Sequence, residues 1–222
     1  MAQDRLLLRP DACASGRFYM ADTSARMTET ILEFWFGADN LESEEQARLA
    51  QRWFSGDAQF DAEIRRRFGS LVDAALAGEL SAWSAQPRSW LALLLLLDQF
   101  PRNLYRGSAQ AFAGDHRAQA TALAGIARGD DLALPARYRA FAYLPLEHAE
   151  EIVLQRHSVD LFRRLAADPE AQPAEQFLMY VEYAKAHHDV IARFGRFPHR
   201  NAVLGRAVTA EEQVYLDQGG GF

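Results

Sequence analysis

A carboxylate and several cationic side chains surround a Phe-Pro sequence in the middle of the chain. Asp98 directly follows the apolar run Trp90–Leu97, and Arg102, Asn103 and Arg106 come shortly after it. A carboxylate at the end of a buried helix opposes the helix dipole and loses its hydration, so it needs a cationic or hydrogen-bonding partner. The pattern is typical of a salt bridge that locks a turn. It also suits a site in which Asp98 orients arginines around an anionic ligand.

A second group of titratable residues lies in the segment LPLEHAEE at 144–151. Glu147, Glu150 and Glu151 are expected in the first turn of a helix, where the positive end of the helix dipole stabilises carboxylates. That effect alone accounts for the three acids. His148 lies beside Glu147 and three residues before Glu151, a spacing that suits a general acid–base pair or two metal ligands. Because two ligands without a third are a weak signal, we predict no metal site.

A third group combines histidines with a run of arginines. His187 and His188 flank the buried face of a helix, so each imidazole needs hydrogen-bond partners and each fits a core histidine. Residues 191–206 then contain four arginines and His199, but no acidic residue. This local positive charge in a net-acidic protein must meet internal carboxylates or an external anion. The end of a helix also favours cations, which is a purely structural explanation.

Two of these groups share a sequence, FPRN at 100–103 and FPHRN at 197–201. In each, the proline is expected to end a helix and the asparagine to tie the turn or cap the next helix. One turn design recurs here, or both turns present arginines at the same edge of a helical stack. The candidate ligand-binding residues are Asp98, Arg102, Asn103, Arg106, Glu147, His148, His188, Arg196, His199, Arg200 and Asn201. The candidates for a catalytic role are His148, Glu147 and His188.

The elements that would position these residues have helical periodicity almost throughout. We expect about nine helices, in stacked antiparallel pairs, and no sheet. The run Trp90–Leu97 has no polar face, which predicts a central helix over 88–100 that Pro101 ends. A capping box is expected at Thr209 and Glu212. Residues 1–26 lack periodicity and are expected to form a disordered or loosely attached extension, with one all-α domain over 27–222.

Composition narrows the classes of function. The chain has 222 residues with 24 basic and 30 acidic side chains, and this net charge of −6 argues against a nucleic-acid partner. The run Leu6–Leu8 is too short for a signal peptide, and no apolar run reaches the length of a membrane span, so we expect a cytoplasmic protein and no membrane partner. The single cysteine, Cys13, excludes zinc or iron–sulfur sites built from several cysteines. Phosphate-binding glycine loops and the common hydrolase motifs are absent, and no cofactor is indicated.

Several long motifs follow one another along residues 27–222. They are ILEFWFG at 31–37, LLLDQFPRNLYRG at 95–107, AFAGD at 111–115, YLPLEHAE at 143–150 and HHDVIARFGRFPHRNAVLGR at 187–206. In this order they resemble an uncharacterised family of bacterial proteins, a domain of unknown function. The resemblance implies an all-α, tetratricopeptide-like fold. Since that family has no established reaction or cofactor, no catalytic residue follows from it.

We therefore expect a helical protein that binds a small anionic molecule, or the acidic end of a peptide, in a pocket lined by Arg, His and Asp side chains. One alternative is a tetratricopeptide-like scaffold that binds other proteins along a groove. The other is a hydrolase-type enzyme that uses a His/Glu pair, such as His148 with Glu147 or Glu151. The sequence leaves the oligomeric state open and does not decide whether the protein is an enzyme.

Overall fold

The structure, a computed structural model, describes residues 12–38 and 43–221. All regular elements in these ranges are helical, which confirms the expected all-α fold. The α-helices are α1 (Ala12–Phe36), α2 (Ser43–Phe54), α3 (Ala58–Ala77), α4 (Pro87–Leu94), α5 (Phe100–Leu104), α6 (Asp115–Arg128), α7 (Ala136–Glu147), α8 (Ile152–Ala166), α9 (Ala174–Phe194) and α10 (Ala210–Asp217). Among these residues, no helix is both long and apolar enough to cross a membrane.

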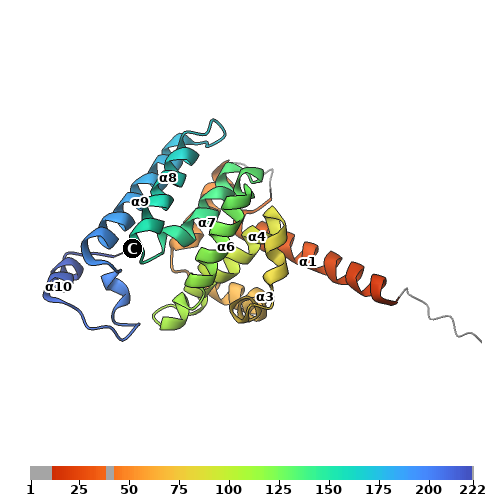
Figure 1. Cartoon of the computed structure of the whole chain (residues 1–222), viewed down its shortest axis with the longest axis horizontal. Helices are drawn as coiled ribbons and strands as arrows, with labels where there is room; N and C mark the ends of the chain where they lie inside the picture. The colour runs from red at the N-terminus through yellow and green to blue at the C-terminus, as the bar shows by residue number, and fades with distance from the viewer. Residues whose placement is uncertain (1–11, 39–42, 222) are drawn as a thin grey trace, which may run out of the picture.

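Short helical turns join several of these helices, and their geometry is either tight (3-10) or wide (π). The 3-10 turns are η1 (Ser81–Ala85), η3 (Ala109–Phe112), η4 (Asp131–Ala133) and η5 (Pro198–Arg200), and η2 (Leu95–Gln99) is a π-helical turn. In Figure 1, α4, α6 and α7 lie in the middle of the molecule, α8 and α9 form an antiparallel pair beside them, and α1 projects on the opposite side. A tetratricopeptide-like arrangement of the pairs stays a prediction. The boundary expected between residues 26 and 27 falls inside α1.

The core is built on aromatic side chains around the buried residue Trp35. Its ring contacts those of Trp53, Phe60, Phe100 and Phe141, with ring centroids 5.4–6.0 Å apart. The side chains of α4 and η2 from Trp90 to Gln99 are also buried, which confirms the expected central position of this segment. Burial of large apolar side chains is the main source of stability in such a fold.

The central helix does not end at Pro101, contrary to the expectation from the sequence. The helical path continues from α4 through η2 into α5, whose first turn contains Pro101. The Phe100 N–H donates to Leu95 O, five residues back, so the turn before Pro101 is wider than an α-helical one. Pro101 lacks the N–H that an α-helix would use, and it lies directly after this wide turn, where the regular α-helical hydrogen bonds are already interrupted.

Two other helix ends differ from expectation, again at prolines. Pro145 lies inside α7, which runs on to Glu147, and α8 begins only at Ile152. Glu147 thus ends one helix and does not begin the next, and the dipole explanation for it was wrong. In the C-terminal segment, Gly195 ends α9 with a φ of 69°, and Pro198 opens η5. The expected capping box of Thr209 and Glu212 is confirmed at the start of α10.

Candidate functional site

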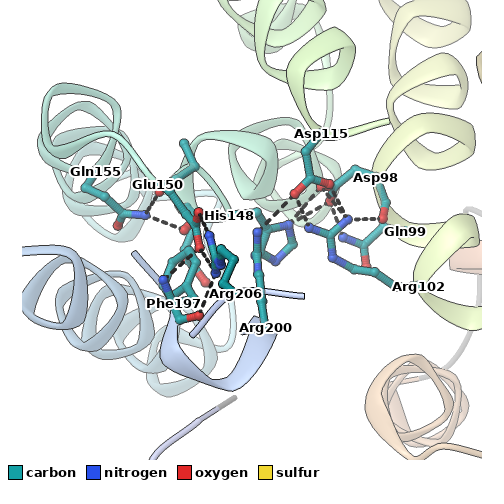
Figure 2. A network of polar contacts seen from close by, with 12 residues as sticks. Asp98, Gln99, Arg102, Asp115, His148, Glu150, Gln155, Phe197, Arg200 and Arg206 are labelled. Atoms are coloured by element: carbon teal, nitrogen blue, oxygen red, sulfur yellow. Dashed lines mark hydrogen bonds and ion pairs between the residues drawn. The ribbon is translucent and has the colours of Figure 1, made fainter. Parts of the chain in front are cut away.

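Charged side chains from distant segments meet where η2, α5, α6, the end of α7 and η5 come together. We call Asp98, Arg102, Asp115, His148 and Arg200 the arginine–histidine centre. Figure 2 shows Asp98, Arg102 and Asp115 as one group, with the Arg200 side chain extending toward it from below. The FPRN segment, the FPHRN segment and the Glu147–His148 segment contribute Arg102, Arg200 and His148 to this centre.

Asp98 is the most deeply buried member of the centre. Its two carboxylate oxygens lie 2.8 and 3.0 Å from His148 Nδ1, and Gln99 Nε2 donates to Oδ2 at 2.6 Å. Arg102 Nη1 lies 3.1 Å from Oδ1. Burial alone would raise the pKa of Asp98, but Arg102 and His148 outweigh it and hold this pKa well below its usual range. Asp98 is therefore a buried, charged carboxylate.

Local backbone structure explains how Asp98 and Asp115 approach the same arginine. The π turn η2 contains Asp98, and Arg102 follows it one turn later in α5, where Arg102 Nη1 also donates to Asp98 O at 2.6 Å. Gly114 precedes Asp115, and a Cβ at this position would lie 2.0 Å from Leu97 O. Only glycine allows the start of α6 to come so close to the π turn. π-Helical turns such as η2 are frequent at functional sites.

Two guanidinium groups share the carboxylate of Asp115. Arg102 lies 3.0 Å from Oδ1 and 3.2 Å from Oδ2, and Arg200 Nη1 lies 3.1 Å from Oδ2. The Arg200 guanidinium carbon lies 4.6 Å from the ring centroid of Phe112 and 4.5 Å from that of Phe197. Arg200 Nε is buried and has no hydrogen-bond partner. The centre thus holds one arginine donor that the protein leaves unused, between two aromatic rings.

The electrostatic potential at the centre disfavours further positive charge. Burial and Arg102 lower the pKa of Arg200 to about 10. Burial and Arg200 lower the pKa of His199 to about 4, and burial and Arg102 lower the pKa of His148. Burial is the largest cause of all three shifts, and the positive charge of a neighbouring arginine adds to it at each group.

A second carboxyl–imidazole pair, Glu147 with His187, lies next to the centre. Glu147 Oε1 is 3.3 Å from His187 Nδ1, which also lies 2.8 Å from Tyr183 O, while Glu147 Oε2 is buried without a hydrogen-bond partner. Burial and the charge of Asp98 raise the pKa of Glu147 to about 8. Burial and His148 lower the pKa of His187 to about 3. Both members of this pair are therefore neutral at pH 7.

Glu150 fixes the segment that carries Arg200. Its carboxylate accepts from the Phe197 N–H at 2.7 Å and from both terminal nitrogens of Arg206 at 2.6 and 2.9 Å. Gln155 Nε2 donates to Glu147 O and Ala149 O and so holds the turn between α7 and α8 (Figure 2). These contacts tie η5 to the end of α7, which sets the distance between Arg200 and His148.

Two candidates from the FPRN segment turn away from the centre. Asn103 Nδ2 donates to Asp61 Oδ1 at 2.7 Å, and Arg106 Nε donates to Asp61 Oδ2 at 2.6 Å. Both side chains line a surface hollow of about 510 Å³ between α3 and α5. Their role in this structure is to attach α5 to α3.

Three candidates from the C-terminal region also make other contacts. Arg196 Nε donates to Glu212 at 2.6 Å, and Asn201 is fully buried, with no hydrogen-bond partner for either atom of its side-chain amide. His188 contacts Asp189 and lines a hollow of about 430 Å³ on the surface of α8 and α9. Neither of the two hollows includes Asp98, His148 or Arg200.

Sequence reasoning missed Asp115 and His187 as members of this region. Asp115 lies in the AFAGD motif after a glycine that makes a close backbone contact, but the sequence does not show which arginine it meets. His187 was considered together with His188, and only the structure shows that His187 faces the buried pair. In the described part of the chain, no three His, Cys, Asp or Glu side chains are grouped as metal ligands would be.

Comparison with other proteins places the chain in a family. Residues 31–220 match the family described as "Bacterial protein of unknown function (DUF924)". The solved structure of ATU0120, a protein of unknown function from Agrobacterium tumefaciens, has a TM-score of 0.75 and 39% sequence identity, covering 88% of this chain and 99% of that chain. No curated protein matches. From the match over residues 31–220 we conclude that the chain belongs to this bacterial family of unknown function.

Proposed function

We propose that the arginine–histidine centre binds a small molecule through a phosphate or carboxylate group. The observation that carries the proposal is the meeting of Arg102 and Arg200 on the single carboxylate of Asp115, with His148 and His199 beside them. Guanidinium groups suit phosphate and carboxylate because they offer paired donors in a plane. An incoming anion would take over part of the role of Asp115.

Three properties support an anionic ligand over a purely internal ion pair. The Nε donor of Arg200 is unused, and its guanidinium group is fixed between Phe112 and Phe197 before any ligand arrives. The pKa values of Arg200 and His199 are lowered by neighbouring positive charge as well as by burial. A donor group that is held in place before binding keeps the ordering cost of binding an anion small.

The proposal is tested by calorimetric titration with inorganic phosphate and with succinate. We expect Arg200→Gln to weaken binding by about 2 kcal/mol or more, roughly thirtyfold in Kd. The matched control is Arg66→Gln on α3, because the Arg66 side chain is 75% exposed. Thermal unfolding of each variant establishes that it is folded. Equal affinity of parent and Arg200→Gln for both probes, or binding of neither probe by the parent, would contradict the proposal.

The anion could belong to a metabolite or to the acidic end of a peptide. Short peptides with a free C-terminal carboxylate, compared with the same peptides amidated, distinguish these sources. A ligand held only by its carboxylate loses binding on amidation, and competition with succinate shows that both occupy the same site. Binding of succinate without competition by any peptide assigns the site to a small molecule.

A scaffold function is the second candidate, and exposed apolar side chains on α9 favour it. Leu178, Met179 and Tyr183 are 57%, 53% and 53% exposed. Exposed apolar patches of this kind mark protein-binding surfaces. A partner that the parent binds in stoichiometric amount should be lost from Leu178→Glu and kept by Val153→Glu, since Val153 is an apolar residue on α8 that is even more exposed, at 68%. Loss from both variants, or from neither, contradicts this function for α9.

A further inference from the structure

We propose that the arginine–histidine centre is also catalytic, with His148 as the general base that activates water to hydrolyse an ester carrying a separate anionic group. This inference rests on the proposed anion binding, because Arg200 and Arg102 would hold the anionic part of the substrate. It assigns His148 as the catalytic residue and Asp98 as its positioning residue. The hydrolase expected from the sequence paired His148 with Glu147 or Glu151, and the structure gives it a different partner.

Asp98 determines which nitrogen of His148 carries the proton. The charged carboxylate can only accept, and both of its oxygens lie within 3.0 Å of Nδ1. Nδ1 must therefore be the protonated nitrogen, and Nε2 keeps its lone pair. Gln99 and Arg102 hold Asp98 from other directions, so the imidazole is oriented by a fixed group. A buried carboxylate that orients a histidine in this way is a general feature of histidine bases.

The pair of Asp98 and His148 extends from the interior toward solvent. The side chain of Asp98 is 1% exposed, whereas those of His148 and Arg102 are 15% and 20% exposed. A substrate can therefore approach the imidazole and the guanidinium group, while the carboxylate stays out of contact with water. Burial and Arg102 keep His148 in its neutral form at pH 7, which is the form a base requires.

Glu147 is excluded as the orienting group by its surroundings. It contacts His187 instead of His148, and burial together with Asp98 raises its pKa to about 8. A neutral carboxyl at pH 7 cannot stabilise the imidazolium that forms when His148 accepts a proton.

The reaction balances with the groups present. His148 Nε2 takes a proton from water, and the water oxygen forms a bond to the ester carbonyl carbon. The carbonyl electron pair moves to its oxygen, which becomes an oxyanion stabilised by Arg102. When the carbonyl re-forms, the bond to the alcohol oxygen breaks, and this oxygen takes the proton from His148. The net change is ester and water to acid and alcohol, with His148 restored.

The first experiment measures hydrolysis of 4-nitrophenyl hydrogen succinate, with 4-nitrophenyl acetate as the substrate that lacks the anionic group. We expect the parent to prefer the succinate ester in kcat/KM and His148→Gln to lose roughly 100-fold or more in kcat. His188→Gln is the matched control, because His188 lies on the outer surface of α9. Hydrolysis that His148→Gln retains, or no hydrolysis beyond buffer by the parent, overturns the inference.

The second experiment tests Asp98 through the chemistry of His148 itself. Diethyl pyrocarbonate acylates an unprotonated imidazole nitrogen, and peptide mass spectrometry measures the rate at each histidine. We expect phosphate to protect His148 but not His188. In Asp98→Asn the amide can donate to Nδ1 and move the proton to Nε2, so labelling of His148 should slow relative to His188. Labelling unaffected by phosphate, or faster in a folded Asp98→Asn protein, contradicts the assignment.

The calorimetric titrations separate this inference from the proposed function. If the parent binds succinate and His148→Gln binds it with Kd unchanged within roughly threefold, but neither hydrolyses the ester, anion binding stands and catalysis fails. If the parent binds neither succinate nor phosphate, the proposed function fails, and the inference fails with it.

Discussion

Two carboxyl–imidazole pairs lie side by side in this protein, and only one of the two carboxyl groups is ionised at pH 7. The rings of His148 and His187 are 6.2 Å apart, and each contacts one buried carboxyl group. Asp98 stays ionised, because Arg102 and His148 lower its pKa despite burial. Glu147 is neutral at pH 7, because burial and the nearby charge of Asp98 both act against ionisation and raise its pKa to about 8.

The two groups are both buried, and they differ because Asp98 has the positive charge of Arg102 and hydrogen-bond donors beside it, whereas Glu147 has the negative charge of Asp98 nearby. Asp98 accepts from Gln99, is paired with Arg102 and meets His148, whereas Glu147 Oε2 has no donor at all. Each group also influences the other, since one ionised carboxylate makes a second one harder to form nearby. His148 and Asp98 can thus serve as base and orienting group while Glu147 and His187 remain uncharged.

The largest effect is expected from removing the charged carboxylate. Asp98→Ala leaves Arg102 without one of its two buried carboxylate partners and His148 without an acceptor, which should lower the free energy of unfolding by about 3–5 kcal/mol. Guanidinium unfolding at pH 7 measures this change. Glu147→Ala is the comparison variant, and an equal loss for both substitutions would contradict the different charge states.

A slightly smaller effect is expected from a backbone change that moves Asp115 away from Asp98 and Arg102. Gly114→Ala places a Cβ 2.0 Å from Leu97 O, so the start of α6 must move away from the π turn. We expect a loss of about 1–3 kcal/mol together with weaker phosphate binding, since Asp115 moves with α6. Gly69→Ala is the control, because no atom lies within 4 Å of a Cβ there. Unchanged phosphate affinity in Gly114→Ala would separate Asp115 from the binding site.

Because of Glu147, the free energy of unfolding should decrease as the pH rises toward 8. The pKa of Glu147 is raised from 4.5 to about 8 in the folded protein, so the folded state holds a proton that the unfolded state has lost. This contribution is complete below pH 4.5 and falls as pH rises toward 8, by at most about 1.4 kcal/mol per pH unit for one proton. Comparing the unfolding free energies of the parent and Glu147→Gln between pH 6.5 and 8 isolates it from the histidines, and parallel curves would contradict it.

The smallest effect is expected from Glu147→Gln at pH 6, where the replaced group is already neutral. The amide has nearly the same shape and can also contact His187, so unfolding should change by less than about 1 kcal/mol. Thermal and guanidinium unfolding at this pH measure it. A loss as large as that of Asp98→Ala would show that Glu147 is ionised in the folded protein.

Much of the fold follows from local rules that act within a few residues. Asp57 accepts from the Gln59 and Phe60 N–H groups at the start of α3, Pro87 opens α4, and Gly195 ends α9 in the left-handed conformation. Each of these signals depends on one backbone turn, which is why the sequence can show it.

The departures come from tertiary contacts that override local signals. Pro101 was expected to end a helix and Glu147 to lie in the first turn of one, yet Pro101 and Pro145 each lie within a helical path whose neighbours are buried. Asp98, Arg102, His148 and Arg200 were chosen by residue type and do meet, whereas Asn103 and Arg106 bind Asp61 instead. Which carboxylate an arginine reaches depends on helix packing, and spacing along the chain does not encode it.

The π turn at Leu95–Gln99 has a consequence for how this protein can change. A π turn holds one more residue than an α-helical turn, and each residue of an α-helix turns the chain by about 100°. Deleting Leu96 would let the segment form an uninterrupted α-helix, and because the π turn absorbs the extra residue, the helix on either side would keep nearly its present orientation. Asp98 lies inside the turn, so the direction of its carboxylate toward His148 would change. Insertion or loss of a single codon is therefore enough to create or remove this constellation.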